Sequence, residues 1–173
     1  DDRQWYYEKI KDLDPMQQVV KVDEQNHIIS YSAAIKSDEK NQKDATPEEC
    51  VRALSICILT RPPYNYPAER LYIEKYYAHG RKGTLSDRVD LLIYDDDDLP
   101  YAMWEIKASK EYKTEQNDAI ELRLFGTAPL VGAPELLVYA TIRPGATDPV
   151  FTLDCIDYTR YKSHNGWTRA GEP

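Results

Sequence analysis

Two apolar segments joined by a run of aspartates carry charges where a buried strand is ordinarily apolar. Residues 86–94 read Ser-Asp-Arg-Val-Asp-Leu-Leu-Ile-Tyr, residues 95–98 are four aspartates, and residues 102–107 read Ala-Met-Trp-Glu-Ile-Lys. Apolar runs on both sides of a polar turn predict two strands in a β-hairpin. If the hairpin folds about the middle of the aspartate run, Asp90 faces Glu105 across the two strands.

Side-chain alternation then gathers the charged groups of this hairpin. Successive strand residues face opposite sides, so Glu105 and Lys107 share one face with Asp90. The same register pairs Tyr94 with Tyr101. Charges are rarely placed among apolar residues unless they are paired or bind a metal. The sequence predicts a patch of two carboxylates and one ammonium. A structural Asp90–Lys107 ion pair with Glu105 at an exposed edge is the competing interpretation.

The remaining sequence predicts an α/β fold with a central mixed sheet flanked by helices. The expected elements are a helix within 1–20 ending near Pro15, a hairpin over 19–32, a loop over 36–45, a helix over 46–61, a strand over 71–77, a helix over 114–125, and strands over 135–142 and 150–156. We expect a single domain over 1–173, with an extension over 1–45, a core over 46–142 and a C-terminal strand and tail over 143–173. We also expect the chain to be a fragment of a larger protein.

Residues 46–49, Thr-Pro-Glu-Glu, form the clearest helix start. Thr46 is a good N-cap and Pro47 suits the first helical position. Glu49 stands where the acidic partner of a capping box is found.

Composition limits the classes of function. The chain has 173 residues, 42% of them hydrophobic, which suffices for a domain with a real core. Its net charge of −8 predicts weak binding to nucleic acid by the domain alone. No apolar run approaches the roughly 20 residues of a membrane span, and no signal peptide is expected. The three cysteines, Cys50, Cys57 and Cys155, have no metal-ligand spacing and are expected in the core of a cytoplasmic protein.

The charged patch has the equipment for phosphodiester hydrolysis. The carboxylates of Asp90 and Glu105, with the backbone carbonyl of Ile106, form a set of hard oxygen ligands for Mg²⁺, for which Mn²⁺ is a possible substitute. A bound metal polarises a phosphate and lowers the pKa of an attacking water. Lys107 is placed to hold that water or to stabilise charge that builds on the phosphate.

The order of motifs resembles a known family. Asp90 followed by Glu105-Ile106-Lys107 is similar to the motif of the PD-(D/E)xK nuclease superfamily, with Val89 in place of the proline. The wider set resembles the N-terminal endonuclease domain of the motor subunits of type I restriction enzymes over residues 46–142. That set is Thr46–Arg52, Tyr66–Leu71, Gly80–Lys82 and Arg88–Asp95.

The resemblance implies roles for individual residues. Asp90 and Glu105 would be metal ligands, and Lys107 the catalytic lysine. The first helix of the family supplies one more acidic residue, for which Glu49 is slightly preferred to Glu48. Many relatives carry a Gln-x-x-x-Tyr motif on the next helix, but here Ile120 stands four residues after Gln116.

Phosphate contacts are expected ahead of the Asp90 strand and on the following helix. Arg81, Lys82 and Arg88 are candidates, with a solvated loop as the alternative. Gln116 and Arg123 could reach DNA, or could lie on a plain surface helix.

We therefore expect a Mg²⁺-dependent DNA endonuclease domain of a restriction or related defence system. Its partners would be DNA and other domains or subunits of a restriction-type complex, without a membrane. The alternative is a non-catalytic domain that keeps the nuclease scaffold and recruits a protein partner. A third possibility is a nuclease that acts on RNA or branched DNA.

Overall fold

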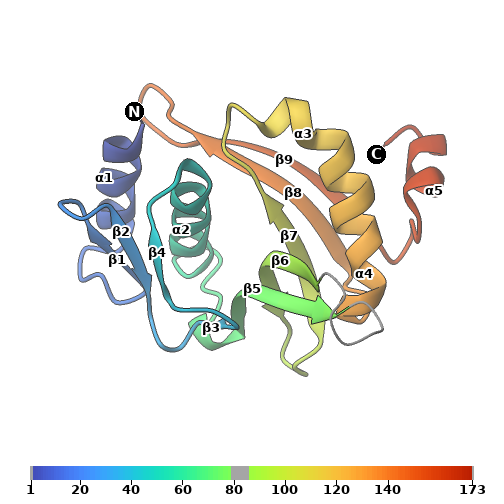
Figure 1. Cartoon of the computed structure of the whole chain (residues 1–173), viewed down its shortest axis with the longest axis horizontal. Helices are drawn as coiled ribbons and strands as arrows, with labels where there is room; N and C mark the ends of the chain where they lie inside the picture. The colour runs from blue at the N-terminus through green and yellow to red at the C-terminus, as the bar shows by residue number, and fades with distance from the viewer. Residues whose placement is uncertain (1, 79–85, 173) are drawn as a thin grey trace.

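The computed structural model describes residues 2–78 and 86–172, which form two sheets and a set of helices (Figure 1). The helical segments are α1 (Arg3–Leu13), α2 (Pro47–Leu59), η1 (Ala68–Arg70), α3 (Tyr112–Asp118), the π-helical η2 (Ala119–Phe125), α4 (Gly126–Val131) and α5 (His164–Arg169). The strands are β1 (Val20–Asp23), β2 (Ile28–Tyr31), β3 (Lys36–Ser37), β4 (Gln42–Asp44), β5 (Leu71–Ala78), β6 (Ser86–Tyr94), β7 (Pro100–Ile106), β8 (Leu136–Arg143) and β9 (Val150–Asp157).

The larger sheet is mixed and has six strands in the order β3-β5-β6-β7-β8-β9. Its β3–β5 and β7–β8 pairs are parallel, and the others are antiparallel. The smaller sheet has the order β1-β2-β4 and is antiparallel. The expected α/β class with a central mixed sheet and flanking helices is therefore confirmed.

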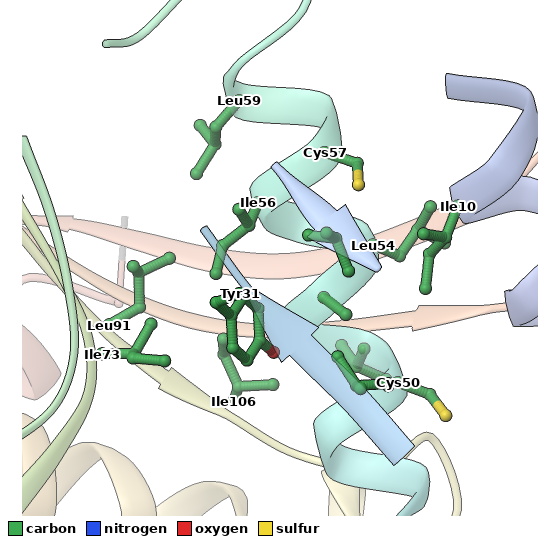
Figure 2. Packing of buried hydrophobic residues seen from close by; sticks show 14 of the residues in the cluster. Ile10, Tyr31, Cys50, Leu54, Ile56, Cys57, Leu59, Ile73, Leu91 and Ile106 are labelled. Atoms are coloured by element: carbon green, nitrogen blue, oxygen red, sulfur yellow. The ribbon is translucent and has the colours of Figure 1, made fainter. Parts of the chain in front are cut away.

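Apolar residues fill one core on each face of the larger sheet. Helices α1 and α2 and the smaller sheet cover the first face, and α3, η2, α4 and α5 cover the second (Figure 1). Figure 2 shows the Tyr31 ring of β2 in the first core, among Ile56, Ile73, Leu91 and Ile106. Strand residues such as Leu91 and Leu92 alternate between the two cores because their side chains point to opposite faces.

Helix α2 begins as its sequence predicts. Thr46 is the N-cap, its hydroxyl accepts the backbone N–H of Glu49 at 3.1 Å, and Pro47 occupies the first turn. The second half of the capping box does not form, because the Glu49 carboxylate is bound to the side chains of Tyr31 and Arg52 instead. The helix is buried along most of its length, which fixes the position of its acidic first turn.

The central hairpin has the expected register for most of its length. The pairs Leu91↔Trp104, Leu92↔Met103 and Ile93↔Ala102 are as predicted, but Tyr94 pairs with Pro100 rather than with Tyr101. A register shift between Ile93 and Tyr94 causes the difference. The Asp95 side chain organises the turn by accepting the backbone N–H groups of Asp97 and Leu99.

Two local predictions were wrong, and one helix is longer than predicted. Residues 36–45 contain β3 and β4, because these short polar strands add to the edges of β5 and β2 without an apolar pattern of their own. The helix predicted over 114–125 is present and extends from Tyr112 to Val131 through the π-helical stretch, and α5 follows β9. Cys155 is exposed, because it lies on the outermost strand β9, whereas Cys50 and Cys57 are buried.

Over the part of the chain that the structure describes, no helix has both the length and the apolar character to cross a membrane.

Candidate active site

The site forms where strands β6 and β7 stop pairing. Their ladder ends at Leu91↔Trp104, and one step further the Asp90 carboxylate accepts the backbone N–H of Ile106 at 2.9 Å. Glu105 lies next along β7 from Trp104, and both acidic side chains are buried, with exposed fractions of 2% for Asp90 and 6% for Glu105. Two carboxylates from neighbouring strands are thus held together away from water.

Lys107 completes the group just beyond the end of β7. Its Nζ lies 3.3 Å from Oε1 of Glu105 and 3.3 Å from Oε2 of Glu115 on α3. It is also 3.7 Å from Oε2 of Glu48 on α2. The three residues predicted to converge, Asp90, Glu105 and Lys107, therefore lie in one cluster, which is in contact with α2 from one face of the sheet and with α3 from the other.

The two glutamates at the start of α2 have different neighbours. Glu48 is about one-quarter exposed and faces the cations of the cluster: Lys107 at 3.7 Å, and Arg52 and Arg88 at 3.8 Å each. Glu49 points to the other side, where it accepts the Tyr31 hydroxyl and pairs with Arg52 at 2.5 Å. Glu48 is thus the helix carboxylate that lies near Lys107.

Burial and like charge set the protonation of Glu105. Burial raises the pKa of Glu105, the adjacent Asp90 charge raises it further, and the result is a pKa of about 8 despite the opposing effect of Lys107. The pKa of Glu48 is also raised, by burial and then by the charge of Asp90. Lys107 shows the reverse: burial lowers its pKa, but Glu105, Glu48 and Asp90 outweigh burial and raise it. The site carries excess negative charge and holds Lys107 firmly as an ammonium.

Residues proposed for DNA contact fall in different places. Arg88 is part of the charged cluster, with its guanidinium 3.3 Å from Glu74 and 3.5 Å from Asp90. Gln116 donates to Asp154 of β9 at 2.8 Å and so lies apart from the cluster. Arg81 and Lys82 lie outside the described residues.

A hollow of about 400 Å³ opens beside Lys107. Its lining residues are Glu105, Lys107, Glu115, Asp118, Ala119, Leu122 and Arg123. Arg123 stands within the π-helical stretch, and its charge lowers the pKa of Glu105. Among the described residues Arg123 makes no ion pair, so its guanidinium is open to an anion in the hollow.

The charged residues of the site that were missed from the sequence include Glu115 of α3 and two buried residues. Arg52 of α2 is only 1% exposed and Glu74 of β5 only 4%. The signal for Arg52 was present: an arginine six residues after the N-cap, on a helix otherwise filled with apolar residues. Glu74 gave a similar signal, since it is the first charge within an apolar strand and the next strand carries Asp90.

The donor set fits a hard divalent cation only in part. Over residues 2–78 and 86–172, no cluster of three or more His, Cys, Asp or Glu side chains is arranged to hold a metal ion. Two buried carboxylates and the Ile106 carbonyl are nevertheless the oxygen donors that Mg²⁺ prefers, and Mg²⁺ ordinarily keeps several waters. Burial and then the charge of Asp90 raise the pKa of Glu105, and a bound cation would oppose both effects. The described residues therefore supply part of a ligand set for Mg²⁺, with oxygen donors of the preferred kind.

A central mixed sheet that brings an aspartate strand together with a Glu-x-Lys strand defines a PD-(D/E)xK-type domain. Residues 47–125 match the family model described as Type I restriction enzyme R protein N terminus (HSDR_N). The matched residues run from α2 through η2, so the resemblance seen in the sequence is confirmed over this part of the chain. No curated protein matches the chain.

Proposed function

We propose that this domain is a Mg²⁺-dependent DNA endonuclease that hydrolyses phosphodiester bonds within a restriction system. The observation that carries the proposal is the convergence of Asp90, Glu105 and Lys107 in a domain of the restriction-enzyme R-protein family. Two neighbouring buried carboxylates are unfavourable for stability alone, because like charges share a site with little solvent and buried ion pairs are often neutral for stability. Such arrangements concentrate at functional sites.

Each residue has a task in the proposed reaction. Asp90, Glu105 and the carbonyl of Ile106 would hold Mg²⁺, which when bound polarises the scissile phosphate and makes a water more acidic. Lys107, kept charged by its carboxylate neighbours, orients the attacking water or stabilises charge on the phosphate oxygens. Glu48, rather than Glu49, would be the helix carboxylate, because it lies 3.7 Å from Lys107.

The hollow beside Lys107 would receive the DNA backbone. Its lining combines the Lys107 ammonium with the exposed guanidinium of Arg123, and phosphate groups favour such charged donors. An acidic domain with a net charge of −8 binds DNA poorly by itself, so most of the affinity would come from other domains or subunits of the complex.

Nicking of supercoiled plasmid tests the proposal. Wild-type protein with Mg²⁺ or Mn²⁺ should convert plasmid to open circles, and Asp90→Ala and Lys107→Ala should abolish the conversion. The matched controls Asp97→Ala and Lys110→Ala remove the same charges at exposed positions and should cleave like wild type. Circular dichroism establishes that every variant is folded.

The same assay decides against the alternatives. Equal residual activity in wild type, Asp90→Ala and Lys107→Ala would contradict the nuclease and favour a domain that recruits a protein partner. Parallel reactions with RNA and branched DNA would show which nucleic acid is the substrate.

A further inference from the structure

The backbone of the larger sheet is distorted beside Asp90. Between β5 and β6 the paired residues run from Ile73↔Leu91 directly to Lys75↔Val89, so Glu74 and Asp90 are left out of the ladder. Glu74 has a φ of +50°, a backbone conformation that is strained for a residue with a side chain. A distortion of this kind persists only when the surrounding contacts impose it.

The distorted residues both bind the buried guanidinium of Arg52, and the more exposed guanidinium of Arg88 also lies 3.3 Å from Glu74 and 3.5 Å from Asp90. Nη1 of Arg52 lies 3.3 Å from Glu74 and 2.5 Å from Glu49, and Nη2 lies 3.1 Å from Oδ1 of Asp90. Arg52 therefore links an acid on α2, an acid on β5 and an acid on β6. A planar guanidinium suits this task because its donors point in fixed directions.

Stability alone does not account for this buried arginine. Arg52 is 1% exposed, and its Nε has no hydrogen-bond partner among the described residues. Replacing buried ion pairs by apolar residues is often neutral or stabilising, so a buried network of this kind is weak evidence for a stabilising role. What the network does provide is a fixed direction for the Asp90 carboxylate, whose second oxygen is held by the Ile106 N–H.

The carboxylates that hold Arg52 are fixed in turn by the smaller sheet. The Tyr31 hydroxyl on β2 donates to Glu49, and Lys43 on β4 pairs with Glu74. Both Tyr31 and Lys43 precede residues 47–125, the segment that matches the family model. The smaller sheet thus holds the two carboxylates that bind Arg52.

We propose that Arg52 is a positioning residue that fixes Asp90 for its role at the metal, and that the smaller sheet fixes Arg52 through Glu49 and Glu74. The inference rests on the proposed function, in which Asp90 is a metal ligand. It adds the requirement that the orientation of the Asp90 carboxylate depends on Arg52. Small misplacements of reacting groups have large effects on rate, which gives the network a catalytic consequence.

The Ile106 amide reports on Asp90 without any need for catalysis. If Arg52 fixes Asp90, then Arg52→Met frees the carboxylate and weakens its bond to the Ile106 N–H. We expect hydrogen exchange of the Ile106 amide, measured by NMR on folded protein without metal, to speed at least about tenfold relative to other β7 amides. Arg52→Lys keeps the positive charge but loses the planar guanidinium, and should give a smaller increase in the exchange rate. Glu74→Gln, which loosens Arg52 from a distance, should act in the same direction.

Arg61→Met is the matched control. Arg61 follows the same helix and pairs with another buried acid, Asp14, at 2.5 Å. Its loss should lower global stability and speed all core amides together, without singling out Ile106. Plasmid cleavage is measured in parallel, and Arg52→Met should reduce the rate at saturating Mg²⁺ at least about tenfold.

The two readouts separate the two proposals. If wild type does not cleave but the Ile106 amide responds to Arg52→Met, the nuclease proposal fails and the placement of Asp90 by Arg52 stands. The positioning role is overturned if, in folded Arg52→Met and Glu74→Gln, hydrogen exchange of the Ile106 amide speeds no more than that of the other β7 amides. This holds whatever the cleavage rate.

Discussion

Asp14 and Glu105 are both buried carboxylates, but their surroundings differ completely. Asp14, just after α1, is 0% exposed and accepts the backbone N–H groups of Gln18, Val19 and Val20 at 2.7–3.1 Å, besides pairing with Arg61. Burial raises the pKa of Asp14, but these donors together outweigh burial and lower it. Every part of this carboxylate is satisfied by the protein.

Glu105 shows the opposite balance. Burial and the nearby charge of Asp90 raise its pKa to about 8, and Lys107 is the one cation within ion-pair distance among the described residues. A carboxylate beside a like charge is less stable ionised than it would be in water. The comparison indicates that Asp14 serves the fold, whereas Glu105 is held in a state that a bound cation would relieve.

The largest expected effect separates the two acids by activity. Glu105→Gln should reduce plasmid cleavage by about 10²–10³-fold, because it removes a charged group from the reacting centre. Asp14→Asn, the same chemical change at the other buried acid, should leave the cleavage rate per folded molecule unchanged. Rates are measured at saturating Mg²⁺, with the folded fraction determined by circular dichroism. Comparable losses in both variants would break the distinction.

The next effect separates them by stability. Asp14→Ala should lower the free energy of unfolding by about 3 kcal/mol, since three backbone N–H groups and a guanidinium lose their shared acceptor. Its control is Asp12→Ala, an exposed acid two residues earlier in α1, which should change stability by less than about 0.5 kcal/mol. Urea denaturation measures both, and a small effect for Asp14→Ala would show that this carboxylate does not hold the α1–β1 connection.

The sequence predicted the cluster of Asp90, Glu105 and Lys107 better than it predicted the residues that hold this cluster in place. Asp90, Glu105 and Lys107 were predicted because hairpin register and side-chain alternation are local rules. The choice between Glu48 and Glu49 could not be made in the same way. It depends on the Tyr31 hydroxyl, which reaches α2 from a sheet far away in the chain and binds Glu49.

The elements missed from the sequence share a physical cause. Strands β3 and β4 are short and polar, and they exist because the edges of β5 and β2 offer unpaired backbone groups. The positive φ of Glu74 likewise has no local signal, because long-range contacts with Lys43 and Arg52 impose it. Elements that show a local pattern of buried apolar residues could be predicted from the sequence. Features that depend on contacts between segments far apart in the chain could not.

The smallest expected effect is a difference in how stability depends on pH. The pKa of Glu105 rises from its ordinary value of 4.5 to about 8 in the folded, metal-free protein, so the folded state binds more protons between these values. Its contribution is present below pH 4.5 and is lost as the pH rises through 8. Asp14 has a lowered pKa, so its contribution is present above its ordinary value of 3.8 and is lost as the pH falls below that value.

Urea denaturation from pH 3 to pH 9 tests these opposite signs. Glu105→Gln should remove the decline in stability between pH 5 and pH 8, while leaving the loss of stability at acidic pH unchanged. Asp14→Asn should reduce the loss of stability at acidic pH and leave unchanged the decline in stability at higher pH. Because a divalent cation favours the charged form of Glu105, excess Mg²⁺ should also remove the decline in wild type but should have no such effect in Glu105→Gln. A decline that persists unchanged in Glu105→Gln would show that Glu105 is not the strained carboxylate of this site.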